Sequence, residues 1–402
     1  MINARRRRVK SIDKEGSRLV IKSWCDELEK QALTQAINLS NHPCTFHHIA
    51  LMPDCHVGYG MPIGGVVALK DAVIPNAVGV DIGCGVRAVQ TDCPVEAIEG
   101  RQIAGIFHLL KDAIPVGFQH HKTPQEWDGF HQAPTDIPVI DREVGSARKQ
   151  LGTLGGGNHF IEIQGGDDGL VWLMIHSGSR NFGYKIAKEY NRQAQALCTR
   201  RQAPIPPFKG EDGLAFLPIG EQIADDYIRS MNFALEFARA NRAAMMKVFE
   251  EIVAGELGAS ALERIDIHHN YAQLEHHFGE DVWVHRKGAT PAYKGELGVI
   301  PGSMGTASYI VRGLGNLESF QSCSHGAGRK MGRGEFSRTH TVEECNREME
   351  GIFFRGWGKG RKGKPDLSEA PSAYKDIDAV MAAQADLVEP AVSLQPLGVM
   401  KG

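Results

Sequence analysis

The chain has 402 residues, 42% hydrophobic and 23% charged, proportions that are ordinary for a soluble globular protein. Its net charge of −3 excludes a global basic field, so any contact with nucleic acid must be local. Eight cysteines without a CxxC pair exclude a disulfide framework and favour a reduced, cytoplasmic setting. No apolar run approaches the ~20 residues of a membrane span, so we expect no membrane association.

The first half of the chain is predicted to contain several strands. Residues 47–92 alternate short apolar runs with glycine turns, which is typical of strands joined by tight loops. Residues 116–140 are rich in proline, histidine and glutamine and predict an irregular surface loop. Residues 170–178 predict a buried strand that ends in a polar turn.

The second half mixes helices with strands and loops. Helical periodicity predicts a long helix over 220–254, and residues 373–388 predict another. Residues 282–286 and 297–300 are expected to be strands, and 300–334 glycine-rich loops. The motifs extend from residue 54 to the last residues without a repeat or a clear linker. We therefore expect one large α/β (α+β) domain over 1–402, with a helical excursion at about 185–260.

Five metal-compatible side chains are scattered along the chain beside glycine, serine or asparagine: Asp81, Cys84, His159, His176 and His269. Each histidine taken singly is more often a structural residue, but five such residues together favour a site. Asp81 and Cys84 are close enough to share one ion, or the thiolate could bridge two. The donor set does not choose the metal, because carboxylate and imidazole admit manganese whereas a thiolate favours zinc.

Three glycine loops suit anions, because successive backbone N–H groups can surround phosphate oxygens. They cover 152–158, 301–305 and 325–328, and a plain tight turn is an equal interpretation of each. A pair of ions near such loops indicates phosphoryl or nucleotidyl transfer. His325 opens the third loop, and a neutral imidazole there could attack an α-phosphate as a nucleophile.

Two basic clusters are either solvated faces or RNA-binding surfaces. The first comprises Arg5 to Arg8 with Lys10. The second comprises Arg355, Lys359, Arg361, Lys362 and Lys364, and it lies near Phe353, Phe354 and Trp357. The aromatic residues favour binding of RNA or phosphate by the second cluster.

Nine ordered motifs resemble those of the RtcB family of RNA-splicing ligases, from about residue 47 to the terminal MKG. They are PDCHVGYGMPIGG, AVGVDIGCG, LGTLGGGNHFIEI, HSGSR, HHNYA, RKGA, GVIPGSMG, SCSHGAGR and AYKDIDAVMAAQADLV. The resemblance implies a β-sandwich-like core flanked by helices, with a deep metal-containing cleft.

The resemblance also implies an RNA ligase that depends on GTP and two Mn²⁺ ions. Such an enzyme joins RNA ending in a 3′-phosphate or 2′,3′-cyclic phosphate to RNA with a 5′-hydroxyl, in splicing or repair. A histidine takes GMP from GTP and passes it to the RNA 3′-phosphate, and the 5′-hydroxyl then displaces GMP. An activating protein is a further partner that the family can require.

Carried onto this chain, the resemblance makes Asp81, Cys84, His159, His176 and His269 metal ligands, with Cys84 bridging both ions and His269 preferred over His268. It makes His325 the GMP acceptor. The implied guanylate contacts are Asn158, Glu162, Ser303, Ser308, His325, Gly326, Ala327, Gly328, Tyr374 and Lys401. The carboxylate of Glu162 could accept hydrogen bonds from the guanine edge or the ribose, and the ammonium of Lys401 could donate a hydrogen bond to guanine O6.

Two other functions remain open at this point. One is a metal-dependent phosphoesterase acting on RNA ends, and the other is a non-catalytic protein that binds RNA ends. Neither function needs a nucleophilic His325, so whether His325 becomes covalently modified discriminates among the three functions.

Overall fold

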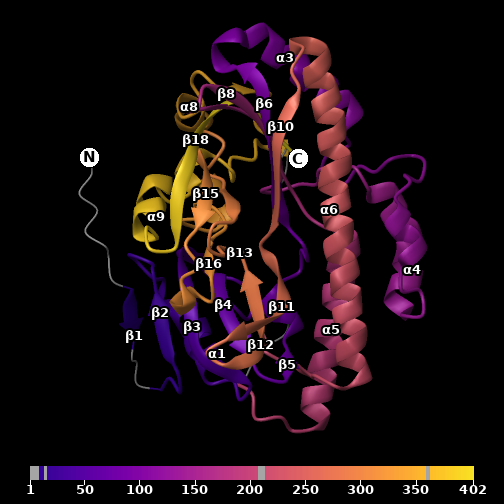
Figure 1. Cartoon of the computed structure of the whole chain (residues 1–402), viewed down its shortest axis with the longest axis vertical. Helices are drawn as coiled ribbons and strands as arrows, with labels where there is room; N and C mark the ends of the chain where they lie inside the picture. The colour runs from indigo at the N-terminus through magenta and orange to yellow at the C-terminus, as the bar shows by residue number, and fades with distance from the viewer. Residues whose placement is uncertain (1–8, 13–15, 207–212, 359–362) are drawn as a thin grey trace.

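The computed structural model describes residues 9–12, 16–206, 213–358 and 363–402. It contains two large sheets, with helices on their outer sides (Figure 1). The first sheet has the strand order β1-β2-β3-β4-β12-β11. Its strands are β1 Lys10–Ile12, β2 Val20–Ser23, β3 Thr45–His56, β4 Ile63–Leu69, β12 Glu280–Lys287 and β11 Asn270–His277. Most of β3 and β4 is buried, in keeping with their apolar runs.

The second sheet has the order β10-β6-β8-β7-β18-β15-β14, with β17 alongside β18. Its strands are β10 Ala261–His268, β6 Gly85–Pro94, β8 Leu170–Ser177, β7 Phe160–Gly166, β18 Val388–Lys401, β15 Ser308–Gly313, β14 Leu297–Ile300 and β17 Phe353–Phe354. Two small sheets pair β13 Ala289–Pro291 with β16 Ser322–Ser324 and β5 Ala72–Val73 with β9 Leu217–Pro218.

The two large sheets share a buried apolar core. One cluster takes Ala50, Val66 and Val284 from the first sheet and Ile300 and Val311 from the second. The predicted β-sandwich-like α/β fold is confirmed. Its organisation as one domain over 1–402 stays a prediction.

The helices pack on these sheets or on one another. They are α1 Lys30–Ser40, α2 Pro75–Val78, α3 Gly100–Ala113, α4 Pro138–Gln150, α5 Arg180–Arg200, α6 Gln222–Leu257, α7 Arg333–Thr339, α8 Val342–Arg347 and α9 Ile377–Ala383. With 36 residues, α6 is about 54 Å long and follows the long axis of the molecule (Figure 1). The expected helical excursion at about 185–260 is the region of α5 and α6.

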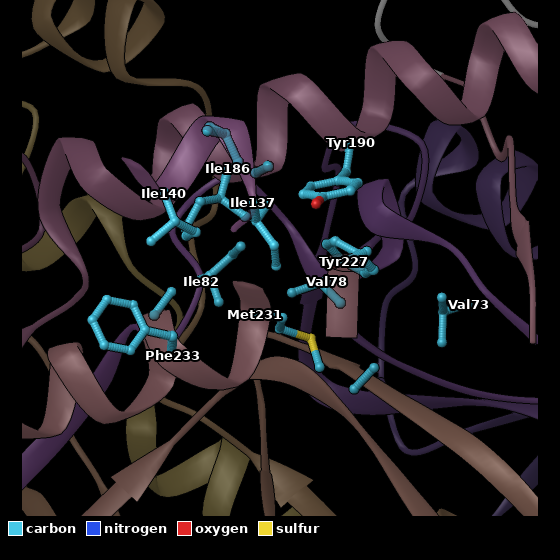
Figure 2. Close-up of a cluster of buried hydrophobic side chains, with 14 of the residues drawn as sticks. Val73, Val78, Ile82, Ile137, Ile140, Ile186, Tyr190, Tyr227, Met231 and Phe233 are labelled. Carbon is cyan, nitrogen blue, oxygen red and sulfur yellow. The ribbon is translucent and has the colours of Figure 1, made fainter. Parts of the chain in front are cut away.

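The turn that carries Asp81 and Cys84 is anchored in an apolar core. Figure 2 shows Val78 and Ile82 among side chains such as Tyr190, Tyr227 and Met231 from α5 and α6. Both aliphatic residues are fully buried. Hydrophobic burial on this side of the turn therefore fixes the backbone from which the two candidate ligands project.

Two predictions about the C-terminal region are wrong in extent. The helix expected over 373–388 covers only Ile377–Ala383. At the residue after its end, Oε1 of Gln384 accepts a hydrogen bond from the backbone N–H of Ser324 at 3.0 Å, and Nε2 of Gln384 donates to the hydroxyl of Ser324 at 2.5 Å. The glycine-rich segment 300–334 also contains β15 and β16, which were expected to be loop.

Candidate active site

The register of the second sheet brings four distant candidate ligands together. Gly85 at the start of β6 faces Ser177 of β8 and His268 of β10, and Phe160 of β7 faces His176. These four strands therefore reach the same edge of the sheet. Each candidate ligand at this edge either occupies one of these paired positions or is its direct neighbour in the chain. These ligands are Cys84, His159, His176 and His269.

The ligand atoms form two overlapping groups, Asp81–Cys84–His159 and Cys84–His176–His269, within 4.8 Å of one another in each. Sγ of Cys84 lies 3.2 Å from Nε2 of His176 and 3.5 Å from Nε2 of His159. Nε2 of His159 lies 3.1 Å from Oδ2 of Asp81. Cys84 belongs to both groups, which is the arrangement required of a bridging thiolate.

Backbone carbonyls fix the ring orientation of two of these histidines. Nδ1 of His159 donates to the carbonyl of Leu154 at 3.0 Å, and Nδ1 of His176 donates to that of Asn158 at 3.1 Å. With Nδ1 bonded to a carbonyl, Nε2 is the nitrogen of each ring left to bind a metal ion. Burial also holds the pKa of His176 and His269 well below the ordinary value, which favours neutral imidazole.

These donors fit a divalent cation. The Nε2 atoms of His176 and His269 lie 3.5 Å apart, and both rings are buried. If both rings carry their proton on Nδ1, the two Nε2 lone pairs repel one another, and a cation between them removes that repulsion. Burial raises the pKa of the Cys84 thiol, and coordination to a metal ion reverses that effect.

His268 does not share this environment. Nδ1 of His268 lies 3.1 Å from the carbonyl oxygen of Gly83 and 3.2 Å from Nη2 of the buried Arg242, so this ring is engaged outside the cluster. Its neighbour His269 has a ring centroid 5.1 Å from that of His176. Of the pair, His269 lies in the cluster with Cys84 and His176, and its role as a metal ligand stays a prediction.

His325 lies beside the cluster, with its ring centroid 4.8 Å from that of His269. Oδ2 of Asp54, a fully buried residue of β3, accepts hydrogen bonds from Nδ1 of His325 at 2.6 Å and from its backbone N–H at 3.1 Å. With Nδ1 bonded to Asp54, Nε2 is the ring nitrogen left to act as a nucleophile. Sequence reasoning missed Asp54, although its PDCH segment joins a carboxylate to glycine turns much as the segment of Asp81 does.

Most of the predicted guanylate contacts surround one cavity of about 230 Å³ next to His176. Its walls include Asn158, Ser303, His325, Gly326, Ala327, Gly328, Tyr374 and Lys401. Glu162 and Ser308 do not line this cavity. Both are buried behind it, where Nε2 of Gln164 donates to the carboxylate of Glu162 at 2.8 Å and to the hydroxyl of Ser308 at 3.1 Å.

The buried carboxyl of Glu162 has an unusual pKa. Burial raises it to about 7, although the positive charge of Lys401 opposes the shift. The two residues belong to neighbouring strands, because Lys401 faces Phe160 in the pairing of β18 with β7. Glu162 therefore changes its charge near neutral pH.

A second carboxylate, Glu369, organises the positive charge around the cavity. It accepts hydrogen bonds from Nε of Arg333 at 2.9 Å, Nη1 of Arg329 at 3.4 Å and the hydroxyl of Tyr374, and Nζ of Lys401 lies 3.7 Å away. Three cations against one carboxylate leave a net positive charge, which suits a phosphate. Sequence reasoning missed Arg333 and Glu369, which belong to none of the quoted motifs.

The glycine loop over 152–158 lies close to Arg180. A side chain at Gly155, whose φ is +95°, would approach Nη1 of Arg180 to 2.0 Å, so only glycine fits. Arg180 donates to Oγ1 of Thr153 at 3.2 Å and to the carbonyl of Gly117 at 3.1 Å. Among the described residues, the backbone N–H groups of Gly156 and Gly157 have no hydrogen-bond acceptor, in keeping with the predicted preference for anions.

The predicted basic clusters are only partly described. Arg5 to Arg8, Lys359, Arg361 and Lys362 lie outside the described residues. Phe353 stacks on Phe107 with centroids 5.5 Å apart, and Nε1 of Trp357 donates to Asn346 at 2.8 Å. These two aromatic side chains therefore support the fold. The role of this surface in RNA binding stays a prediction.

Comparison with known proteins decides the family. The family model described as tRNA-splicing ligase RtcB matches residues 35–402. The chain belongs to the RtcB family. It is 39% identical to the RNA-splicing ligase RtcB of Escherichia coli K12, over 95% of this chain and 97% of that protein.

More distant RtcB relatives match over nearly the same span. The RNA-splicing ligase RtcB of Mycobacterium tuberculosis is 33% identical, over 92% of this chain and 100% of that protein. The tRNA-splicing ligase RtcB of Pyrobaculum aerophilum is 32% identical, over 92% and 91%. The predictions of RtcB membership and of a ligase enzyme are confirmed. In the described part of the chain, no helix combines the length and apolar character needed to cross a membrane.

Proposed function

We propose that this chain is a GTP- and Mn²⁺-dependent RNA ligase that joins 3′-phosphate or 2′,3′-cyclic phosphate ends to 5′-hydroxyl ends. We propose further that it acts as a single cytoplasmic domain in RNA splicing or repair, with an activating protein as a further partner. One observation carries the proposal. The buried Asp54 holds Nδ1 of His325 at 2.6 Å, so that Nε2 is free beside both the metal-ligand cluster and a cationic cavity.

Two manganese ions would be held by Asp81 and His159 on one side and by His176 and His269 on the other, with Cys84 shared. When bound, such a pair neutralises phosphate charge and aligns the attacking and leaving oxygens. The chain contributes the neutral rings, whose Nδ1 atoms are tied to backbone carbonyls, and the apolar core that fixes the turn of Asp81 and Cys84.

His325 would act as the nucleophile. Nε2 attacks the α-phosphorus of GTP, a nitrogen–phosphorus bond forms, and the bond to pyrophosphate breaks. The positive charge that develops on the ring is stabilised by Asp54 through Nδ1–H, and the same hydrogen bonds hold the ring in place. Water would first open a 2′,3′-cyclic phosphate to a 3′-phosphate. The 3′-phosphate of RNA then takes GMP as the nitrogen–phosphorus bond to His325 breaks, and the 5′-hydroxyl of the second strand displaces GMP.

The remaining residues would bind and orient the nucleotide. Arg329, Arg333 and Lys401 supply positive charge around the cavity, and Glu369 fixes their positions. Ser303 and the loop over 325–328 offer polar groups to the phosphate and ribose. Glu162 and Ser308 are buried behind the wall, so their roles as guanylate contacts require a rearrangement on binding.

The test incubates the purified protein with α-labelled GTP and Mn²⁺, and then with an RNA pair ending in 3′-phosphate and 5′-hydroxyl. Wild type is expected to carry covalent label and to join the strands, whereas His325→Ala is expected to do neither. Phosphate release without any labelled protein would instead indicate a phosphoesterase. Binding without either reaction would indicate a protein that only binds RNA ends.

A further inference from the structure

The long helix α6 carries two adjacent polar side chains, Asn241 and Arg242, that are both fully buried. Neither residue lies in one of the motifs that pointed to the site. Burying a polar side chain costs free energy unless its atoms are hydrogen-bonded, and a buried ion pair stabilises a fold little compared with apolar residues of similar volume. The place of these two residues in the core therefore indicates a role beyond the stability of the helix.

Arg242 binds the backbone directly beside two candidate metal ligands. Nη1 donates to the carbonyl of Gly83 at 2.9 Å and to that of Ser177 at 3.0 Å. These residues are the chain neighbours of Cys84 and His176. One nitrogen of the guanidinium therefore fixes the separation between the turn before β6 and the end of β8.

The other edge of the same guanidinium holds β10, the strand that leads to His269. Nε and Nη2 of Arg242 donate to Oδ1 of Asp266 at 3.1 and 2.5 Å. Nη1 of Arg87 on β6 donates to Oδ2 of the same carboxylate at 3.1 Å. Arg242 thus joins the three strand ends that carry one group of candidate ligands.

Asn241 binds a different set of backbone groups. Its Oδ1 accepts hydrogen bonds from the backbone N–H groups of Gly152 at 2.7 Å and Thr153 at 3.1 Å. Its Nδ2 donates to the hydroxyl of Ser177 and to the carbonyl of Gly178, each at 3.2 Å. The amide therefore ties the glycine loop over 152–158 to the turn that follows β8.

These anchors lie against Asp81 and His159. The hydroxyl of Ser177 donates to the carbonyl of Leu154 at 2.7 Å, and the same carbonyl accepts from Nδ1 of His159 at 3.0 Å. A Cβ on Gly178 would approach Oδ1 of Asp81 to 2.3 Å, so the backbone at this glycine is in close contact with the carboxylate. Through these contacts Asn241 sets the positions of the second group of candidate ligands.

The helix comes this close because the turn before β6 contains glycine. Gly83 has a φ of +73°, and a Cβ there would approach Cβ of Ala238 to 2.9 Å. Ala238 lies one helical turn before Arg242. A larger residue at either position would push α6 away from the backbone groups that it binds.

We propose that Asn241 and Arg242 are positioning residues for the two manganese ions, one residue for each ion. Arg242 holds the ligand group that includes His269, and Asn241 holds the group that includes His159. The inference rests on the proposed function, since it concerns the ions of that reaction. Ligands that are held in place before the ion arrives bind it more tightly, and losing such outer partners weakens metal binding about 10- to 100-fold.

The test titrates the full-length protein with Mn²⁺ alone, without GTP or RNA, and follows free Mn²⁺ by electron paramagnetic resonance. Arg242→Lys keeps the charge but replaces the planar fork with a single ammonium group, which cannot reach all three strands. This variant is expected to weaken one of two Mn²⁺ sites about 10- to 100-fold. Arg286→Lys is the matched control, because Arg286 is equally buried and its hydrogen bonds go to Tyr271, Glu275, Phe320 and Ser322. It should lower the melting temperature and leave both sites as in wild type.

Asn241→Ala is expected to weaken the other site by a similar factor. Ser230→Ala removes a fully buried polar group from the same helix, a hydroxyl that donates to the carbonyl of Asp226 at 2.7 Å, and should bind Mn²⁺ as wild type. If either main variant does not fold, Asp266→Asn replaces Arg242→Lys and Ser177→Ala replaces Asn241→Ala, since each alters a single heavy atom.

Ligand variants identify which site each residue serves. Arg242→Lys should have no further effect in His269→Ala, where its site is already lost, and should weaken the remaining site in His159→Ala. Asn241→Ala should show the reverse pattern.

Three results would overturn the inference. They are wild-type Mn²⁺ binding in both variants, equal weakening in Arg286→Lys, and weakening of both sites by either variant alone. Wild type that binds no Mn²⁺ would contradict the proposed function as well. Wild-type Mn²⁺ binding in both variants, together with GMP labelling of wild type, would overturn this inference and leave the proposed function standing.

Discussion

The metal-ligand cluster and the cavity beside His325 are adjacent but are built in different ways. The cluster comes mainly from neighbouring strand ends of one sheet, where register alone aligns Cys84, His159, His176 and His269. The cavity draws its walls from loops after β14 and β16, from the segment before α9 and from the end of β18. In the cluster the side chains present lone pairs to a shared centre, whereas around the cavity positively charged side chains pair with the carboxylate of Glu369.

This difference determines how strongly a substitution in each region affects activity. Each side chain of the cluster would address the ions directly, so no other group takes the place of a ligand that a substitution removes. The cavity has Glu369 at the centre of several bonds, so the loss of one partner leaves the others in place. Substitutions in the cluster should therefore abolish activity, and substitutions in the cavity should reduce it by degrees.

The largest effect is expected for Cys84→Ala. If the thiolate serves both ions, its loss should reduce GMP labelling to background even at high Mn²⁺ and lower the manganese content measured by elemental analysis. Cys93→Ala changes another buried thiol, at the far end of β6, and should label as wild type. Full labelling of Cys84→Ala would contradict a bridging role.

Asp54→Asn should reduce the rate of GMP labelling by about 10²- to 10⁴-fold, because the charge that stabilises the ring of His325 is lost. Manganese content should stay at the wild-type level. The matched control is Asp281→Asn, which alters an exposed pair in which His276 donates to Asp281 at 2.8 Å. Equal rates for the two variants would show that Asp54 only supports the fold.

Glu162 predicts a pH dependence. Its pKa is about 7 in the folded protein, so the carboxyl is neutral below this pH and ionised above it. If the ionised form accepts N–H bonds from guanine, kcat/KM for GTP labelling should fall about tenfold per pH unit below 7 and level off above it. Glu162→Gln should be low and flat over the same range. An unchanged pH profile in this variant would assign the titration to another group.

The smallest effect is expected for Tyr374→Phe. The lost hydroxyl is one of several groups bound to Glu369, so KM for GTP should rise only about three- to tenfold. Tyr309→Phe is the matched control, because its hydroxyl donates to Asp378 at 2.5 Å but lines no part of the cavity. Complete loss of labelling in Tyr374→Phe would mean that the cavity depends on this one hydroxyl rather than on several partners of Glu369.

The same contrast explains what the sequence could predict. Asp, Cys and His beside glycine are recognisable one at a time, and strand register then brings them together. The long helix over 220–254 followed from periodicity. Arg333 and Glu369 act only through partners far along the chain, so no local pattern marks them. Asp54 has a glycine setting like that of Asp81, but its partner His325 lies far along the chain. β18 was missed because it contains Pro390 and Pro396, and it accommodates Pro396 at a shift in register with β7.

The central claim is the division between metal-ligating residues and a GMP-carrying His325. The most direct test measures bound manganese and covalent GMP on the same samples of wild type, Cys84→Ala and His325→Ala after incubation with GTP and Mn²⁺. His325→Ala should keep the manganese content of wild type and carry no GMP, and peptide mapping should place the wild-type adduct on His325. The account would be contradicted if His325→Ala still carried covalent GMP, or if this variant lost manganese as well as GMP.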